Sequence, residues 1–253
     1  AVGMRHLDPH GRGNTPANAA AGQAIKVIRA PHRHQRVQHA RGGGMHNCMT
    51  GCIVKCSNIV HDKDGNYVTS ALEFETLTLL GSCCAINNWE DVADLDRLCD
   101  ELGLDTIETG AAIAVLMDAG GMEWGDAVGA KKLLSEGISA GERDAVDVAN
   151  GAVAVGKTHN HARVPVAKGQ AMPAWDPRPL LAAGITYCSS AMGADHTAGL
   201  VVDPSISGEA AVVASQEVQV INAVCDTSGF CMFLGPTIDE HSKFFSIMFD
   251  EEV

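Results

Sequence analysis

Hydrophobic residues in the middle of the chain recur at steps of three and four, which is the spacing of one face of an α-helix. The first such run begins after Asn88, and acidic residues occupy its other faces. Its apolar positions are Trp89, Val92, Leu95, Leu98 and Leu102. Gly103 comes directly afterwards, where glycine commonly ends a helix in a left-handed conformation. We therefore expect a helix over 88–102 that ends at Gly103.

Similar apolar patterns, separated by turns that contain glycine, continue along the rest of the chain. They predict four further helices, at 106–118, 123–135, 141–155 and 209–224. Short strands are expected at 66–70 and 199–202, and irregular backbone at 165–178. These elements indicate a mainly α-helical fold with two helical lobes, one over residues 1–155 and the other over residues 156–253.

The first forty residues have a different character. Thr15 and Pro16 are typical of a helix start, and the alanine-rich stretch after them predicts a helix that leads into a basic loop. Residues 1–41 hold seven Lys or Arg and one acidic residue. Such an arm suits an anionic ligand, an acidic partner or a cofactor phosphate, or it is a solvated leader segment.

Composition limits the class of protein. Hydrophobic residues make up 46% of the chain and charged residues 19%, which is enough for a sizeable core. No apolar run reaches the roughly 18–20 residues that a membrane span needs, and no signal-peptide pattern opens the sequence. The net charge of −13 argues against nucleic acid as a partner, because phosphate binding needs a basic surface. We expect a soluble protein with no membrane span and no nucleic-acid partner.

The nine cysteines are too clustered, and odd in number, for a disulfide scaffold, which indicates a reducing, cytoplasmic compartment. Cys48, Cys52 and Cys56 place three thiols within nine residues. An iron–sulfur cluster commonly takes three thiolates from one such segment and a fourth from a distance. A zinc site completed by His46 or His61, and three small core residues on one helix face, are the alternatives. Cysteines with apolar neighbours are predicted to be inert, namely Cys83, Cys84, Cys99, Cys188 and Cys225.

Two segments, 100–105 and 226–231, share the form Asp-x-x-Gly-apolar-(Asp or Cys). Each follows the end of a predicted helix. They are either unrelated helix-ending turns, where Asp and Gly are common, or matching turns that hold the two halves of a roughly symmetric ligand. Cys231 closes the second segment and is the candidate for a remote fourth cluster ligand.

Five motifs resemble, in the same order, those of the aldehyde:ferredoxin oxidoreductases, the tungsten bis-pterin enzymes. They are the cysteine loop with the following Glu-Phe-Glu-Thr at 73–76, the two aspartate segments, Lys168–Arg178, and Gly-Ala-Asp-His at 193–196. Together they cover the chain from about 42 to 233. Two details depart from the family pattern: three residues, instead of two, separate Cys48 from Cys52, and Met192 stands where arginine is common.

The resemblance implies a role for each matching residue. The ligands of one 4Fe–4S cluster would be Cys48, Cys52, Cys56 and Cys231. Asp100 and Asp226 would each accept hydrogen bonds from one pterin, and the same cofactors would be lined by Leu104, Asp105 and Phe230. The metal is held by the pterins in this family, so it needs no protein ligand. His196 would move a proton beside the metal, with Glu75 or Glu73 as its partner; without the resemblance, His196 is read as a hydrogen-bonded buried histidine.

The activity implied is oxidation of aldehydes to carboxylic acids on a tungsten or molybdenum bis-pterin. Electrons would pass through the cluster to ferredoxin or an iron–sulfur electron-transfer subunit, and the substrate would be a small aldehyde or acyl-type molecule, in a homo- or hetero-oligomer. The alternatives are a benzoyl-CoA reductase-type tungsten subunit, a non-catalytic iron–sulfur electron-transfer or assembly subunit, and a zinc-stabilised structural module. The family's N-terminal β-rich domain has no counterpart here, so we expect a partial chain equivalent to the second and third domains.

Overall fold

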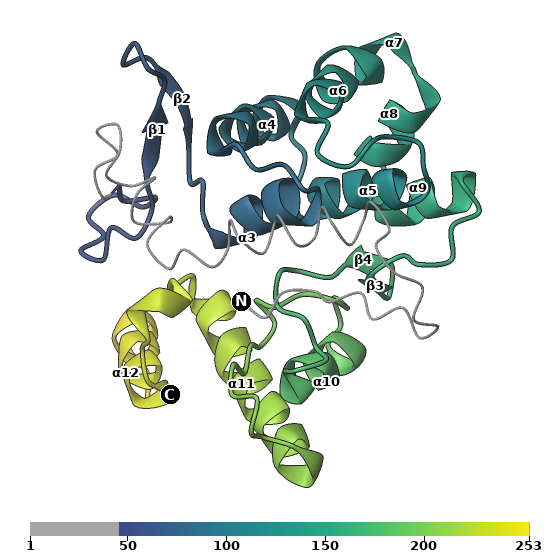
Figure 1. The fold of residues 1–253 in the computed structure, drawn as a ribbon. Helices are drawn as coiled ribbons and strands as arrows, with labels where there is room; N and C mark the ends of the chain where they lie inside the picture. Colours follow the sequence, from purple (N-terminus) through teal and green to yellow (C-terminus); the bar gives the residue numbers. More distant parts are fainter. Residues whose placement is uncertain (1–45, 253) are drawn as a thin grey trace. The chain divides into compact units, whose positions relative to one another are not determined.

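A computed structural model of the chain describes residues 46–252 and is mainly helical there, as predicted (Figure 1). The helix and basic loop expected near the N-terminus lie outside the described residues. The chain divides into two compact units between Ala174 and Trp175. Relative to the predicted boundary after residue 155, the first unit also includes 156–174, because α9 (Ala152–Thr158) and β4 (Gln170–Ala171) both pack against α5 (Thr106–Asp118).

The first unit contains two short antiparallel hairpins. β1 (Ile59–His61) pairs with β2 (Tyr67–Ser70), which confirms the strand predicted at 66–70. β3 (Val166–Ala167) pairs with β4 within the segment predicted to be irregular. The two residues between β3 and β4 have positive φ angles of 52° and 89°, which is the tight turn that hairpins favour.

Helices make up most of the rest of the first unit. The elements not yet given are α3 (Phe74–Thr76), η1 (Leu77–Cys83), α4 (Trp89–Leu102), α6 (Ala127–Lys132), η2 (Leu133–Gly137), α7 (Ile138–Ala140) and α8 (Arg143–Ala149). The helices predicted at 88–102 and 106–118 are confirmed by α4 and α5. The helix predicted from 123 begins later, because the Asp126 side chain caps α6 by accepting the Gly129 N–H. The one predicted over 141–155 is broken into α8 and α9 at Gly151, whose φ is 94°.

The core of the first unit includes most of α5, which is buried along most of its length. Its Gly110 lies against η1: a Cβ there would stand 2.6 Å from the carbonyl carbon of Leu79. Glycine therefore permits the close approach of these two backbones. α4 turns its predicted apolar face inward, with Val92, Leu95 and Leu98 buried.

The second unit is built on two paired helices, α10 (Leu181–Ser189) and α11 (Gly208–Ser228), followed by a third, α12 (Ile238–Phe249). It also contains η3 (Met232–Leu234). α11 confirms the predicted helix and extends it to Ser228, whereas α10 and α12 were not predicted. The strand expected at 199–202 is wrong, since this stretch is irregular and runs along α11.

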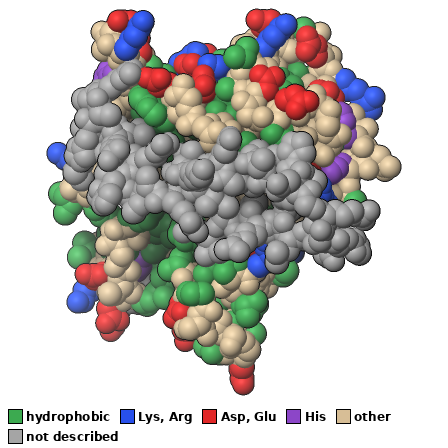
Figure 2. All heavy atoms as spheres, viewed as in Figure 1, with side chains coloured by type: hydrophobic (Ala, Val, Ile, Leu, Met, Phe, Trp, Pro, Cys, Tyr) green, Lys and Arg blue, Asp and Glu red, His purple; other side chains and the backbone are tan. Residues whose placement is uncertain are grey.

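This unit exposes many hydrophobic side chains, some of which are visible beside α11 and α12 in Figure 2. They include Val212, Val213 and Val220 on α11, and Ile247 and Met248 on α12. Within residues 46–252, no helix has both the length and the hydrophobicity to cross a lipid bilayer.

Candidate functional site

The cysteine loop extends from a closed base. His46 and Ser57 exchange two backbone hydrogen bonds of 2.8 and 3.0 Å, and the backbone turns at Gly51, where φ is 83°. Cys48 and Cys56 are exposed and Cys52 is half-buried; no described cysteine forms a disulfide. Three thiols on one exposed loop form a donor set that suits an iron–sulfur cluster, because such clusters are held by soft thiolates.

No three His, Cys, Asp or Glu side chains come together as a metal site anywhere in residues 46–252. The loop therefore offers three donors without gathering them, and neither histidine considered for zinc joins them. Cys231 belongs to the second unit, where it is half-buried and precedes η3. Its part in a cluster stays a prediction.

Of the five cysteines predicted to be inert, three are buried, Cys83 is half-buried and Cys188 is exposed. Cys84 donates to the carbonyls of Leu79 and Gly110 at 3.3 Å, and burial raises the pKa of its thiol well above the usual value. Cys99 and Cys225 are also buried, whereas Cys188 is exposed.

The first aspartate segment forms the end of α4. Asp100 lies in the last turn of the helix, not after it as predicted, and its side chain is exposed. Gly103 ends the helix with φ 68°, donating its N–H to the Asp100 carbonyl at 3.2 Å. Asp105 then caps α5, its Oδ2 accepting the N–H of Glu108 at 2.8 Å. Leu104 is half-buried between them.

The second segment repeats this geometry at the end of α11. Asp226 is exposed in the last helical turn, and Gly229, with φ 74°, donates its N–H to the Asp226 carbonyl at 3.3 Å. Phe230 is half-buried, and Cys231 begins the next helical turn. Cys231 has φ −70° and ψ 130°, whereas the corresponding Asp105 has φ −70° and ψ 128°. The two segments that are similar in sequence therefore also have similar backbone conformations.

The repeat is longer than the predicted form. A buried cysteine precedes each aspartate, namely Cys99 and Cys225. A buried polar residue lies four positions before each aspartate, namely Asp96 and Asn222. Sequence reasoning missed these four residues, although aligning the two segments further toward the N-terminus would have found them.

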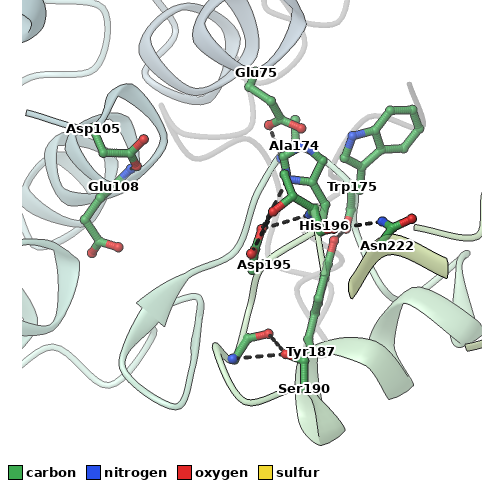
Figure 3. A network of polar contacts seen from close by, with 12 residues as sticks. Glu75, Asp105, Glu108, Ala174, Trp175, Tyr187, Ser190, Asp195, His196 and Asn222 are labelled. Atoms are coloured by element: carbon green, nitrogen blue, oxygen red, sulfur yellow. Dashed lines mark hydrogen bonds and ion pairs between the residues drawn. The ribbon is translucent and has the colours of Figure 1, made fainter. Parts of the chain in front are cut away.

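The two candidate glutamates lie at the start of α3. Glu73 precedes the helix and is half-buried. Glu75 Oε2 accepts the backbone N–H of Ala174 at 2.7 Å (Figure 3). Glu108 acts in the same way, since its Oε2 accepts the N–H of Ala171 at 2.8 Å. Two carboxylates thus hold the first half of the loop 168–178.

His196 lies on a loop of the second unit between α10 and α11. Its side chain is one-fifth exposed, and its Nδ1 is 4.0 Å from Asp195 Oδ1. Asp195 is itself occupied by the N–H and the hydroxyl of Thr197, at 2.8 and 2.7 Å. His196 is therefore partly buried within a turn that Asp195 and Thr197 order.

Residues 16–253 match the sequence model of a family described as aldehyde ferredoxin oxidoreductase, domains 2 & 3. The chain belongs to this family. This confirms the family recognised from the sequence motifs, and the helical fold agrees with it.

Two curated relatives carry the name tungsten-containing aldehyde ferredoxin oxidoreductase. The one from Pyrococcus furiosus is 26% identical over 191 residues, which cover 65% of this chain and 31% of the relative. The one from Thermococcus kodakarensis is 26% identical over 195 residues, which cover 66% of this chain and 32% of the relative. The matched region thus spans about a third of the length of these relatives.

Proposed function

We propose that this chain carries the pterin-binding and proton-transferring residues of a tungstopterin oxidoreductase that converts aldehydes to carboxylic acids. The observation that carries the proposal is the pair of matching turns, each ending a helix with a left-handed glycine and presenting an exposed aspartate. Membership of the aldehyde ferredoxin oxidoreductase family supports it at the level of the reaction class.

In this proposal each turn holds one pterin. Asp100 and Asp226 accept hydrogen bonds from the amino-pyrimidinone edge of a pterin, because an ionised carboxylate can receive two parallel N–H donors. Both carboxylates are exposed, as a ligand-binding group must be before its ligand arrives. Leu104 and Phe230 line the cofactors beside them, together with Asp105.

Three thiolates of the cysteine loop hold a 4Fe–4S cluster, with Cys231 as the fourth ligand. Cys48 and Cys56 of this loop are exposed, so an inorganic core can reach them. When bound, the tungsten or molybdenum bis-pterin supplies the two-electron oxidation of the aldehyde carbon, and the cluster carries the electrons away one at a time.

The protein's own part in the reaction is to orient the substrate and to move a proton. His196 accepts or donates that proton at its imidazole, which can serve as either a general acid or a general base. Glu75 is the proposed partner, with Glu73 as the second choice; the Ala174 hydrogen bond supports Glu75 because it fixes the orientation of this carboxylate. The proposed electron acceptor is ferredoxin or an iron–sulfur subunit in the cytoplasm.

The test is elemental and pterin analysis of the full-length native protein, purified without oxygen, followed by an assay of aldehyde-dependent reduction of a viologen dye. We expect tungsten or molybdenum, two pterins and four irons per chain, together with aldehyde turnover. Iron without pterin would overturn the proposal in favour of an electron-transfer or assembly subunit, and zinc alone would favour a structural module. Bound tungsten with reduction of an aromatic thioester, but no aldehyde turnover, would contradict the proposed direction.

A further inference from the structure

Asn222 joins the second aspartate turn to the loop that carries His196. It is 6% exposed, and its Nδ2 donates a hydrogen bond of 2.8 Å to the carbonyl oxygen of Thr197, the residue after His196 (Figure 3). Asn222 lies one helical turn before Asp226 on α11, so the two side chains leave the same face about 6 Å apart along the helix axis.

The His196 loop, at 190–207, contains no helix or strand to fix its position. Several of the bonds within it are local: Ser190 Oγ bonds both the N–H and the carbonyl of Gly193, and Asp195 bonds Thr197. Bonds of this kind set the form of a turn but do not attach it to the rest of a unit. The Asn222 amide attaches the loop to α11 through the Thr197 carbonyl.

A second contact places the loop against the same helix. A Cβ on Gly199 would stand 2.8 Å from Cγ1 of Val218, so the backbone at Gly199 runs directly along α11. Thr197 is thus held by a hydrogen bond and Gly199 by close packing, immediately after His196.

The first unit uses the equivalent position in the same way. Asp96, four residues before Asp100, is 3% exposed and accepts a hydrogen bond of 2.6 Å from the Thr69 hydroxyl. Thr69 belongs to β2, in the hairpin that follows the cysteine loop. In both units, a buried polar residue one turn before the aspartate ties α4 or α11 to a neighbouring segment close in sequence to a proposed site.

We propose that Asn222 is a positioning residue that sets the place of His196 relative to the Asp226 turn. The inference rests on the proposed function, because it assigns His196 the proton-transfer step. The Thr197 carbonyl can only accept, so the residue at 222 must donate, which an amide does and an ionised carboxylate does not. Asn222→Asp therefore removes the donor while keeping the size of the side chain.

The first experiment is hydrogen–deuterium exchange of the full-length holoprotein, followed in peptides that cover 193–200. In Asn222→Asp we expect the amides of this loop to exchange about tenfold faster or more, because the loop opens locally without its anchor. Thr186→Val is the matched control: Thr186 is fully buried on α10, and its hydroxyl bonds the Ala182 carbonyl and Ser215. It should leave exchange at 193–200 unchanged.

The second experiment is a double-mutant cycle with His196→Asn, assayed by aldehyde-dependent dye reduction alongside tungsten and pterin content. We expect Asn222→Asp alone to lower kcat by about 10- to 100-fold, with KM and cofactor content retained, since misplacement of a catalytic group by about 1 Å has effects of this size. When His196 is already replaced by Asn, adding Asn222→Asp should lower kcat only a little further, because the histidine that Asn222 positions is already absent.

The inference is overturned if loop exchange in Asn222→Asp equals that of the unmodified protein, or if its effect on kcat multiplies fully with that of His196→Asn. Failure of the proposed function gives a different result. Then the native protein lacks pterin, or His196→Asn keeps full activity, while exchange still reports whether Asn222 anchors the loop.

Discussion

The turn at 100–105 forms the end of a helix whose inner face is buried, whereas the turn at 226–231 forms the end of one that exposes Val212, Val213 and Val220. The backbones of the two turns agree closely, with glycine φ angles of 68° and 74°. The side chains that pack beneath the two turns differ. The first turn rests on the aliphatic core around α5, and the second on aromatic side chains of α12.

The buried cysteine before each aspartate shows the same contrast. Cys99 bonds Thr109 on α5, and burial raises the pKa of its thiol to about 12. Cys225 lies 3.5 Å from Nε2 of His241 on α12, and the His241 ring packs against Phe230 at 5.6 Å. A short local sequence is therefore enough to form such a turn, while the side chains that support it differ between the two units.

The largest effect is expected from the aspartates themselves. Asp100→Ala and Asp226→Ala should each lose most of the bound pterin and tungsten, since each removes charge-assisted hydrogen bonds of about 1.5–3 kcal/mol apiece. Metal and pterin content per chain measure this. The neighbouring exposed residues Glu101 and Thr227 provide controls: their replacement by alanine should leave cofactor content intact. If replacing only one of the two aspartates strongly lowers the pterin and metal content, the two turns are not equivalent.

Substitutions beneath the two turns should differ in their cost to the free energy of unfolding more than substitutions within the turns do. His241→Ala is expected to destabilise the second unit by about 2–4 kcal/mol, because it leaves a cavity beside Phe230 and removes the partner of Cys225. Thr109→Val, which removes one hydroxyl from beneath the first turn, should cost about 1 kcal/mol. Urea unfolding followed by limited proteolysis of each unit separates the two effects. Equal losses in the free energy of unfolding would show that the aromatic side chains stabilise their turn no more than the aliphatic ones stabilise theirs.

The two glycines test whether the turns are locally equivalent. A Cβ on Gly103 or Gly229 would meet no atom within 4 Å, so alanine should cost only the strain of a left-handed backbone, about 1 kcal/mol at each site. The shifts in the urea midpoint of the two units should therefore correspond to nearly equal free energies. A cost several times larger at one glycine would contradict the shared geometry.

The smallest effect is expected at Asp96. Burial raises the pKa of this carboxyl to about 6, so its ionisation opposes folding as the pH rises from about 4 through 6, and its contribution to stability is lost above that range. Asp96→Asn gives the first unit the amide that the second unit has at Asn222 and removes the buried charge. It should raise the free energy of unfolding by on the order of 1 kcal/mol at pH 7.5, and by less at pH 5. Thermal unfolding at the two pH values measures this, and an equal gain at both would refute it.

The sequence by itself determined the elements whose signals are local. The apolar spacing of 88–102 and the glycine after it specify α4 and its left-handed end, because periodicity and capping act within a few residues. The order of the five motifs was sufficient to recognise the family. The capping box at Thr237 and Glu240, which starts α12, was equally local and was overlooked.

Only the tertiary structure decided which distant groups meet. α10 contains glycine and β-branched residues of low helix propensity, and packing against α11 stabilises it despite them. The partners of Glu75 and Asn222 lie 99 and 25 residues away in the chain, and no spacing rule connects a side chain to a backbone group at that distance. Burial of Asp96 and Asn222 against these partners depends on how whole helices pack, which is a property of the fold rather than of any short segment.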